Sequence, residues 1–280
     1  MDNLQLFKPE PEKTGEILYK PLERPVWSEN KAALIAQYLQ YFVYITRNGT
    51  YIDAFAGPQT EASDQAWTVK KVLETEPKWF RHFYLFDKSP EQVKKLNTLA
   101  DEHSDRQIQV HKGDSNQMLR SVLPVESIRE GEATFCLLDQ RTFQCEWQLC
   151  KHVSQIRPGS RKVEQFYFLA TGWLSRALTA TSTRGGEETI AAWFGNEDWK
   201  ELISMSSIER AEVFKGKFQE ELGYRHVKWW PIYSEESGKG RVMYHMIHAT
   251  DHDDAPKQMY RAYRKTVNSS ESIDQLRLQV

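Results

Sequence analysis

The chain has 280 residues, of which 40% are hydrophobic and 12% aromatic, so it has enough apolar side chains to bury a substantial core. Its formal net charge of −2 excludes a generally basic nucleic-acid coat protein, although a local basic groove is compatible with it. No stretch reaches the apolar length of a membrane span and the first 20 residues are polar, so we expect a cytoplasmic protein with no membrane partner.

The N-terminal part of the chain changes character near residue 28. The first 28 residues contain four prolines and no hydrophobic periodicity, which predicts an arm rather than a packed element. From Ser28, a suitable N-cap, apolar residues recur at helical spacing as far as Val43. This helix is expected to end near Arg47, with Gly49 as the glycine that follows a helix C-terminus.

Short apolar runs then alternate with helical segments, a pattern typical of a parallel sheet covered by helices on both faces. The first five predicted strands are 50–57, 82–87, 108–114, 134–139 and 163–170. Predicted helices begin at Ser89 and cover 147–156.

The C-terminal part adds a helical segment and two more strands. Residues 173–223 are mostly helical, 227–233 and 242–249 form an antiparallel pair, and 255–267 form the last helix. We therefore predict a doubly wound α/β domain over 29–268, whose seven-stranded sheet is mostly parallel with an antiparallel last strand. A helical insertion covers about 174–223, and 269–280 are expected to form a flexible tail.

Aspartates stand in or at the end of four of the first five predicted strands, namely Asp53, Asp87, Asp114 and Asp139. Ligands of open α/β sheets bind outside the carboxyl ends of the strands. Carboxylates gathered there suit S-adenosylmethionine (SAM), which has ribose hydroxyls, an adenine amino group, an ammonium and a sulfonium. The alternative is that these aspartates are helix N-caps.

Each candidate has an expected role in holding SAM. Asp87 is predicted to accept hydrogen bonds from both ribose hydroxyls, and Asp114 with Ser115 from the adenine amino group. Gly57 lets the backbone approach the amino-acid end of the ligand, because it lacks a Cβ. A nicotinamide dinucleotide is disfavoured, because no GxGxxG turn follows the first strand. The predicted cofactor-binding residues are Asp53, Phe55, Ala56, Gly57, Asp87, Lys88, Asp114 and Ser115.

The segment 51–58, YIDAFAGP, resembles the YIDxFAGPG opening of the three-Cys-motif partner proteins, a family of predicted SAM-dependent methyltransferases. The similarity extends over roughly 28–267, through 31–44, 164–168, 173–177 and 244–263. It implies a Rossmann-like methyltransferase fold, SAM near Asp53, Gly57, Asp87 and Asp114, and a genetically linked protein that carries the three-cysteine motif. The three cysteines of this chain, Cys136, Cys145 and Cys150, are unrelated to that motif and are expected to be reduced thiols.

Two positions depart from the family pattern. Gln59 stands where the family usually has glycine, and 139–142 read Asp-Gln-Arg-Thr where the family is closer to Asp-Pro-Phe-Gly. A nitrogen-methylating site uses an acid or amide to accept from the target amino group, often with an aromatic stacked on a base. Asp139 and Gln140 are therefore the candidate catalytic residues, and nucleic acid is the candidate substrate.

Two other functions are compatible with the sequence. The departures at Gln59 and 140–142 favour a catalytically degenerate methyltransferase fold that acts as a binding or interaction subunit. Asp139 and Glu164 resemble the carboxylate pair of a metal-dependent nuclease, but the lysine expected two residues after the glutamate is replaced by Phe166. Histidines crowd the end of the last strand at His245 and His248, in a spacing for which we predict no metal site.

Overall fold

The computed structural model describes residues 9–11, 17–19, 26–58, 66–129, 131–157, 161–235 and 239–267. Gln59 and the predicted tail lie outside the described residues. Near the N-terminus, β1 (Pro9–Pro11) pairs antiparallel with β2 (Ile17–Tyr19). The division of the chain into arm, domain and tail stays a prediction.

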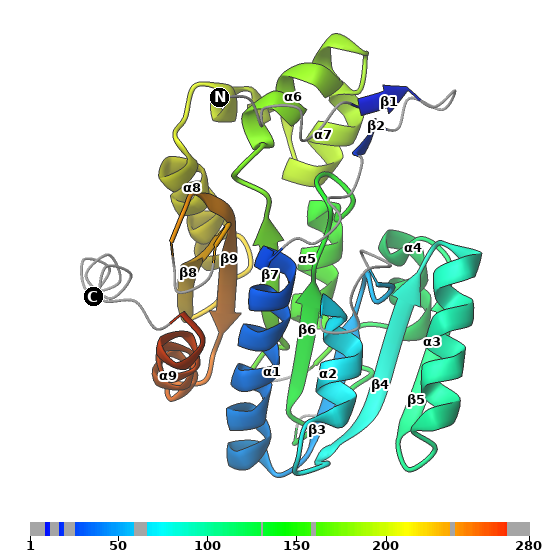
Figure 1. The fold of residues 1–280 in the computed structure, drawn as a ribbon. Coiled ribbons are helices and arrows are strands. Elements are labelled where there is room, and N and C mark those ends of the chain that lie inside the picture. Colours follow the sequence, from blue (N-terminus) through cyan, green and yellow to red (C-terminus); the bar gives the residue numbers. More distant parts are fainter. Residues whose placement is uncertain are drawn as a thin grey trace.

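A seven-stranded sheet forms the centre of the molecule (Figure 1). Its strands lie in the order β5-β4-β3-β6-β7-β9-β8, and β9 runs antiparallel to both of its neighbours. The described strands confirm the predicted α/β class, with a mostly parallel sheet and an antiparallel final pair. Their bounds are β3 Gly49–Asp53, β4 Phe80–Asp87, β5 Gln107–Lys112, β6 Thr134–Leu138, β7 Glu164–Leu169, β8 His226–Tyr233 and β9 Val242–Thr250.

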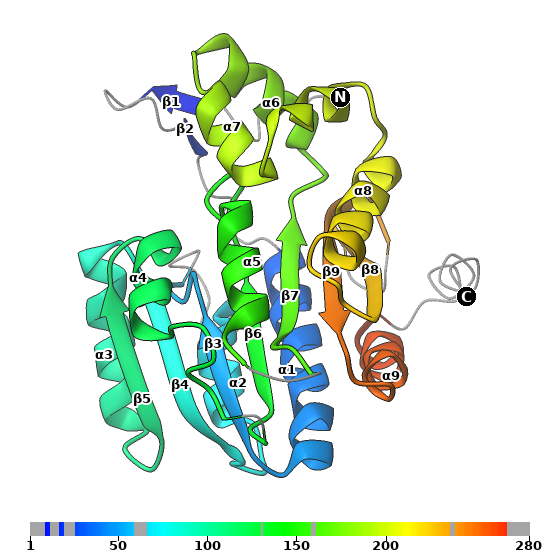
Figure 2. The same cartoon turned by 180° about the vertical axis from the view of Figure 1, so that it is seen from behind.

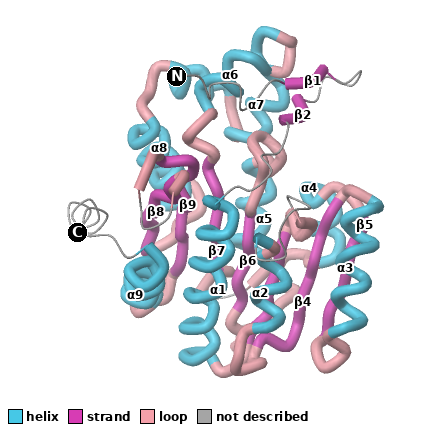
Figure 3. Tube along the Cα trace, in the orientation of Figure 1, coloured by secondary structure: helices cyan, strands magenta, loops and turns pink. Residues whose placement is uncertain are grey.

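Helices cover both faces of this sheet (Figures 1 and 2). One face carries α1 (Val26–Thr46), α2 (Thr68–Glu74), α3 (Pro90–Glu102) and α9 (Ala255–Val267). The opposite face carries α4 (Ser115–Val122), α5 (Trp147–Gln155) and α8 (Ser207–Glu220). Beyond the carboxyl end of β7 follow α6 (Leu174–Thr183), α7 (Glu187–Phe194) and the 3₁₀ helix η2 (Glu197–Ile203), and the alternation of strands and helices is clear in Figure 3.

The core consists of two hydrophobic clusters, one on each face of the sheet. Tyr38 of α1 packs on Phe166 with ring centroids 4.9 Å apart on one face, and Trp147 packs on Phe218 at 5.2 Å on the other. Because every residue of β3 and β6 is buried, their sequences are mainly apolar and do not alternate between apolar and polar residues. Large aromatic and aliphatic residues of 193–218 are also buried in this core, namely Trp193, Phe194, Trp199, Leu202, Phe214 and Phe218.

Helix α1 ends close to the predicted position, near Arg47, but its start and the residue that follows it differ from the prediction. The helix begins at Val26, two residues before Ser28, and it ends at Thr46. The residue in the left-handed conformation after it is Arg47, with φ 55°, so the expectation of a glycine at that place is wrong. Gly49 instead opens β3, where a Cβ would lie 2.8 Å from the Phe80 ring, so the glycine is needed for close packing.

Candidate functional site

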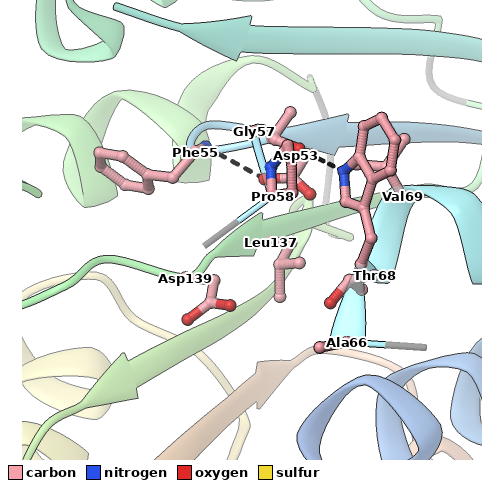
Figure 4. A pocket seen from close by; sticks show the side chains of 11 residues that line it. Asp53, Phe55, Gly57, Pro58, Ala66, Thr68, Val69, Leu137 and Asp139 are labelled. Atoms are coloured by element: carbon pink, nitrogen blue, oxygen red, sulfur yellow. Dashed lines mark hydrogen bonds between the residues drawn. The ribbon is translucent and has the colours of Figure 1, made fainter. Parts of the chain in front are cut away.

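The strand order reverses between β3 and β6. From β3 the chain moves outward through β4 to β5, and then returns to β6 on the other side of β3. A reversal of this kind leaves a crevice at the carboxyl ends of the two strands, where α/β proteins bind their ligands. Asp53 ends β3 and Asp139 directly follows β6, and both line the cleft at this point (Figure 4).

The cleft combines a tight turn, two carboxylates and an indole. Its lining residues are Asp53, Phe55, Ala56, Gly57, Pro58, Ala66, Trp67, Thr68, Val69, Leu137 and Asp139. Five of the ten residues predicted to bind the cofactor or to act in catalysis are among them, namely Asp53, Phe55, Ala56, Gly57 and Asp139. The other five, which do not line the cleft, are Asp87, Lys88, Asp114, Ser115 and Gln140.

Asp53 is a buried carboxyl group, with 2% of the residue exposed. Its Oδ1 accepts from the Phe55 backbone N–H at 3.0 Å, and its Oδ2 accepts from the Tyr51 hydroxyl at 3.0 Å. Burial raises the pKa of Asp53 to about 7, the Phe55 N–H opposes this rise, and the negative charges of Asp139 and Asp87 add to it. Near neutral pH this carboxyl is therefore partly protonated, and a cation nearby would favour its charged form.

Asp87 connects the turn after β3 to the start of α3. Its Oδ2 accepts from the Gly57 N–H at 3.0 Å, and its Oδ1 accepts from the Ser89 N–H at 2.8 Å. Each carboxylate oxygen has a second acceptor position, so these bonds leave room for two hydroxyl donors. Ser89 is the N-cap of α3 and Pro90 its first residue, as predicted.

Gly57 lies in close contact with Asp87 and α3. A Cβ at this position would lie 2.4 Å from Asp87 Oδ2 and 2.7 Å from Gln92 Cβ, so only glycine fits without a shift. Gln92 Oε1 is buried and has no hydrogen-bond partner among the described residues. A ligand donor near this turn would satisfy that oxygen. Gln92 is not among the predicted site residues.

Trp67 adds an aromatic ring to the cleft. Its Nε1 donates to the carbonyl oxygen of Ala56 at 2.9 Å, and the Ala56 N–H donates to the Phe86 carbonyl at 2.9 Å. The turn after β3 is thus bonded to β4 and to the residue that precedes α2. Trp67 is not among the predicted site residues, although a tryptophan shortly after a glycine turn at a strand end is a usable signal.

Asp114 and Ser115 already have structural partners. Asp114 is exposed and caps α4, and its Oδ1 accepts from the backbone N–H and from Nδ2 of Asn116, both at 2.9 Å. Ser115 is buried and donates its hydroxyl to the Ala54 carbonyl. The structure therefore supports the helix-cap alternative at Asp114, and neither residue lines the cleft. Their contact with adenine stays a prediction, as does a role for Lys88, which is exposed after β4.

Asp139 forms a buried ion pair with Lys31 of α1. Lys31 Nζ lies 2.8 Å from Oδ1 and 2.6 Å from Oδ2 of Asp139, and the two side chains are 2% and 8% exposed. The lysine was not predicted as a site residue. A signal existed, because Lys31, Ile35, Tyr38 and Phe42 share one face of the helix, and a lysine in an apolar stripe needs a partner.

Gln140 is buried and its amide is used within the protein. Its Oε1 accepts from the Cys145 N–H at 3.0 Å, and its Nε2 donates to the Phe168 carbonyl at 3.5 Å. Phe143 packs on Trp193 with ring centroids 5.0 Å apart, while Arg141 is exposed. The amide of Gln140 therefore fixes the 140–145 segment, and its catalytic role stays a prediction.

The nuclease interpretation is not supported by the strand register. Glu164 lies opposite Phe135 in the β6–β7 pairing, whereas Asp139 comes four residues later, about 13 Å further along the strand. Glu164 is instead bonded to His248 and Thr250. Within the described part of the chain, no group of three or more His, Cys, Asp or Glu residues is arranged to hold a metal ion.

No protein-family model matches the sequence, and no curated protein matches it. Within the described ranges, no helix combines the length and the apolar character needed to cross a membrane.

Several solved methyltransferase structures are similar in fold, at low sequence identity. The DszA carbon methyltransferase has a TM-score of 0.45 at 13% identity, over 76% of this chain and 52% of that one. TYW2 of M. jannaschii, solved in complex with AdoMet, has a TM-score of 0.43 at 12% identity, over 89% and 88% of the two chains. An rRNA methylase from Streptococcus thermophilus has a TM-score of 0.39 at 9% identity, over 82% and 98%. The chain spans about half the length of the DszA protein.

Proposed function

We propose that this protein binds SAM in the cleft between β3 and β6 and transfers its methyl group to an acceptor. The observation that carries the proposal is the convergence of Asp53, Gly57 and Asp139 at the point where the strand order reverses. The donor set fits the ligand, because carboxylates suit a cation and hydroxyl donors, and the turn at Gly57 has no side chain to obstruct it.

The residues of the cleft divide the binding between them. Asp87 offers one acceptor position on each oxygen to a pair of hydroxyls, while the Gly57 and Ser89 N–H groups hold its carboxylate in place. Asp53 becomes ionised when a cation lies nearby, and Gln92 Oε1 accepts a donor that it otherwise lacks. Bound SAM supplies an already activated methyl group, so the protein contributes mainly position and alignment.

Asp139 is the residue that we propose to orient the acceptor. Its carboxylate lies at the carboxyl end of β6 and lines the cleft. An amino or hydroxyl acceptor would donate a hydrogen bond to it, which turns the lone pair of the acceptor towards the methyl group. Nucleic acid remains our candidate for the acceptor, because Asp139 follows β6 at the position where nitrogen-methylating sites have an acid or amide.

Calorimetry with matched ligands tests the cofactor proposal. The wild-type protein is expected to bind 5′-methylthioadenosine at least about tenfold more tightly than its 2′-deoxy form, because Asp87 accepts from the ribose hydroxyls. Asp87→Ala should abolish SAM binding and remove any preference between these two nucleosides. Asp254→Ala, an exposed aspartate before α9, is the control. Unchanged SAM affinity in Asp87→Ala would contradict the proposal.

A second candidate function is a methyltransferase fold that binds SAM without catalysis and acts as an interaction subunit. Two observations favour it: Lys31 contacts both oxygens of Asp139, and Gln140 makes hydrogen bonds within the protein through both its Oε1 and its Nε2. Transfer of a labelled methyl group from SAM to nucleic acid or protein, with and without a three-Cys-motif protein as partner, separates the two. Transfer to any acceptor rejects the passive subunit.

A further inference from the structure

Lys31 is a buried cation at the Asp139 end of the cleft. Its ammonium contacts both oxygens of Asp139 and lies 5.1 Å from the Phe168 ring centroid and 5.0 Å from that of Tyr244. The lysine comes from α1, whereas the rings come from β7 and β9, so three elements hold the charge in place. The ammonium of Lys31 is therefore fixed next to the cleft rather than extended into solvent.

The ion pair changes the charge that a ligand meets. Burying a lysine and an aspartate costs free energy that their attraction only partly repays, so the pair is a weak source of stability. The pair does change the electrostatic potential in the cleft, because the positive charge of Lys31 offsets the negative charge of Asp139 at hydrogen-bond distance. Asp53 and Asp87, which have no lysine or arginine partner among the described ion pairs, then supply the negative charge of the site.

We propose that Lys31 determines the charge specificity of the cleft. By neutralising Asp139, it limits the preference for a sulfonium cation over the neutral thioether that is left after methyl transfer. This inference rests on the proposed binding of SAM. It concerns the discrimination between SAM and S-adenosylhomocysteine, two ligands that differ by one methyl group and one positive charge.

The ratio of the two dissociation constants measures this discrimination directly. Lys31→Met keeps an unbranched side chain, shorter by the terminal ammonium, and removes its charge, so Asp139 is left negative. The affinity for SAM should then rise relative to that for S-adenosylhomocysteine by at least about tenfold. Asp139→Asn leaves the lysine positive, so the ratio should change about tenfold in the opposite direction. In the double variant Lys31→Met/Asp139→Asn the charges balance again, and the ratio should return to within about threefold of the wild-type value.

A purely structural role of Lys31 gives a different pattern. Loss of packing alone would weaken both ligands in parallel and leave the ratio unchanged in all variants, which would overturn the inference. Calorimetry measures both dissociation constants for each variant, and thermal unfolding shows that each variant is folded. If Lys31→Met does not fold, the comparison of Asp139→Asn with the charge-balanced double variant still decides the matter.

The experiment also separates this inference from the function on which it depends. If the wild-type protein binds neither SAM nor S-adenosylhomocysteine, the proposed function fails, and with it the role of Lys31. If both ligands bind and the single variants do not shift the ratio in opposite directions, the cofactor assignment stands and the role of Lys31 is rejected.

Discussion

His248 of β9 and Glu164 of β7 face each other within the core, with Nε2 of the histidine 2.9 Å from Oε1 of the glutamate. The Tyr38 hydroxyl of α1 donates to the same glutamate oxygen, and Thr250 donates to the other at 2.9 Å. The two facing side chains are 2% and 6% exposed. Glu164 therefore connects α1 and β9 to β7, at the end of β7 opposite to the cleft.

Removing the tyrosine hydroxyl should destabilise the protein without affecting ligand binding. Tyr38→Phe takes one donor from a buried carboxylate, and we expect the free energy of unfolding to fall by about 1–3 kcal/mol. Tyr44→Phe is the matched control on the same helix, because Tyr44 is 54% exposed, and it should change stability by less than about 0.5 kcal/mol. Denaturant unfolding measures both, and equal losses in the two variants would contradict the role of Tyr38.

Gly57→Ala tests the packing of the turn against Asp87. The new Cβ would lie 2.4 Å from Asp87 Oδ2 and 2.7 Å from Gln92 Cβ, so the turn or α3 must shift. We expect a loss of about 1–3 kcal/mol in unfolding free energy, together with a loss of SAM affinity. Gly216→Ala in α8 is the control, because a Cβ there has nothing within 4 Å and alanine should stabilise the helix by about 0.5–1 kcal/mol.

Asp53 should make the stability of the protein depend on pH. Its pKa is raised from 3.8 in the unfolded chain to about 7 in the folded one, so the folded state holds the proton more strongly. Its stabilising contribution to the free energy of unfolding is therefore fully present below about pH 4. This contribution is lost as the pH rises towards 7, because unfolding then releases a bound proton.

Asp53→Asn removes this titration. The variant should be more stable than the wild type above pH 7, by up to a few kcal/mol, and the difference should shrink as the pH falls towards 4. The amide can still accept from the Phe55 N–H, and its Nδ2 can donate to the Tyr51 oxygen. Chemical denaturation at several pH values provides the measurement, and a difference that does not vary with pH would show that Asp53 is not the titrating group.

The three cysteines should be unreactive in the folded protein. Cys136, Cys145 and Cys150 are all buried thiols, and Cys145 Sγ lies 3.8 Å from Cys150 Sγ. Burial raises the pKa of Cys136 and of Cys145, and the hydrogen bond to Cys150 raises that of Cys145 further, so neither forms the reactive thiolate readily. A thiol reagent should modify all three only after denaturant is added. Modification under native conditions, at the rate of a free thiol, would contradict this.

The sequence predicted the fold well because its signals are local. Each central strand is a short apolar run, and the α3 boundary follows from Ser89 and Pro90 alone. The order of the strands has no such local signal. The sequence indicated an antiparallel final pair, but the insertion of β9 between β7 and β8 depends on contacts such as Phe166 with His248, which are 82 residues apart.

The candidate site was predicted only in part, for a related reason. Strand ends predicted Asp53, Gly57 and Asp139 as site residues, and all three line the cleft because parallel strands finish at the same edge of the sheet. Their roles there stay a proposal. Local sequence cannot distinguish an aspartate that caps a helix from one that contacts a ligand. The role of Asp114 as the N-cap of α4 is visible only in its hydrogen bond from the Asn116 N–H. The partner of Asp139 comes from a helix 108 residues earlier in the chain, and no spacing rule relates the two.

The position of β9 has a consequence for how the protein is made. Among the described strands of the sheet, β9 is the last to be synthesised, yet it occupies an interior place in the sheet. Until Val242–Thr250 have been synthesised, β7 has no neighbour on one side, and its backbone groups there are open to pairing with other chains. The terminal hairpin therefore closes an aggregation-prone edge late, and chains that stop before it should depend on chaperones to stay soluble.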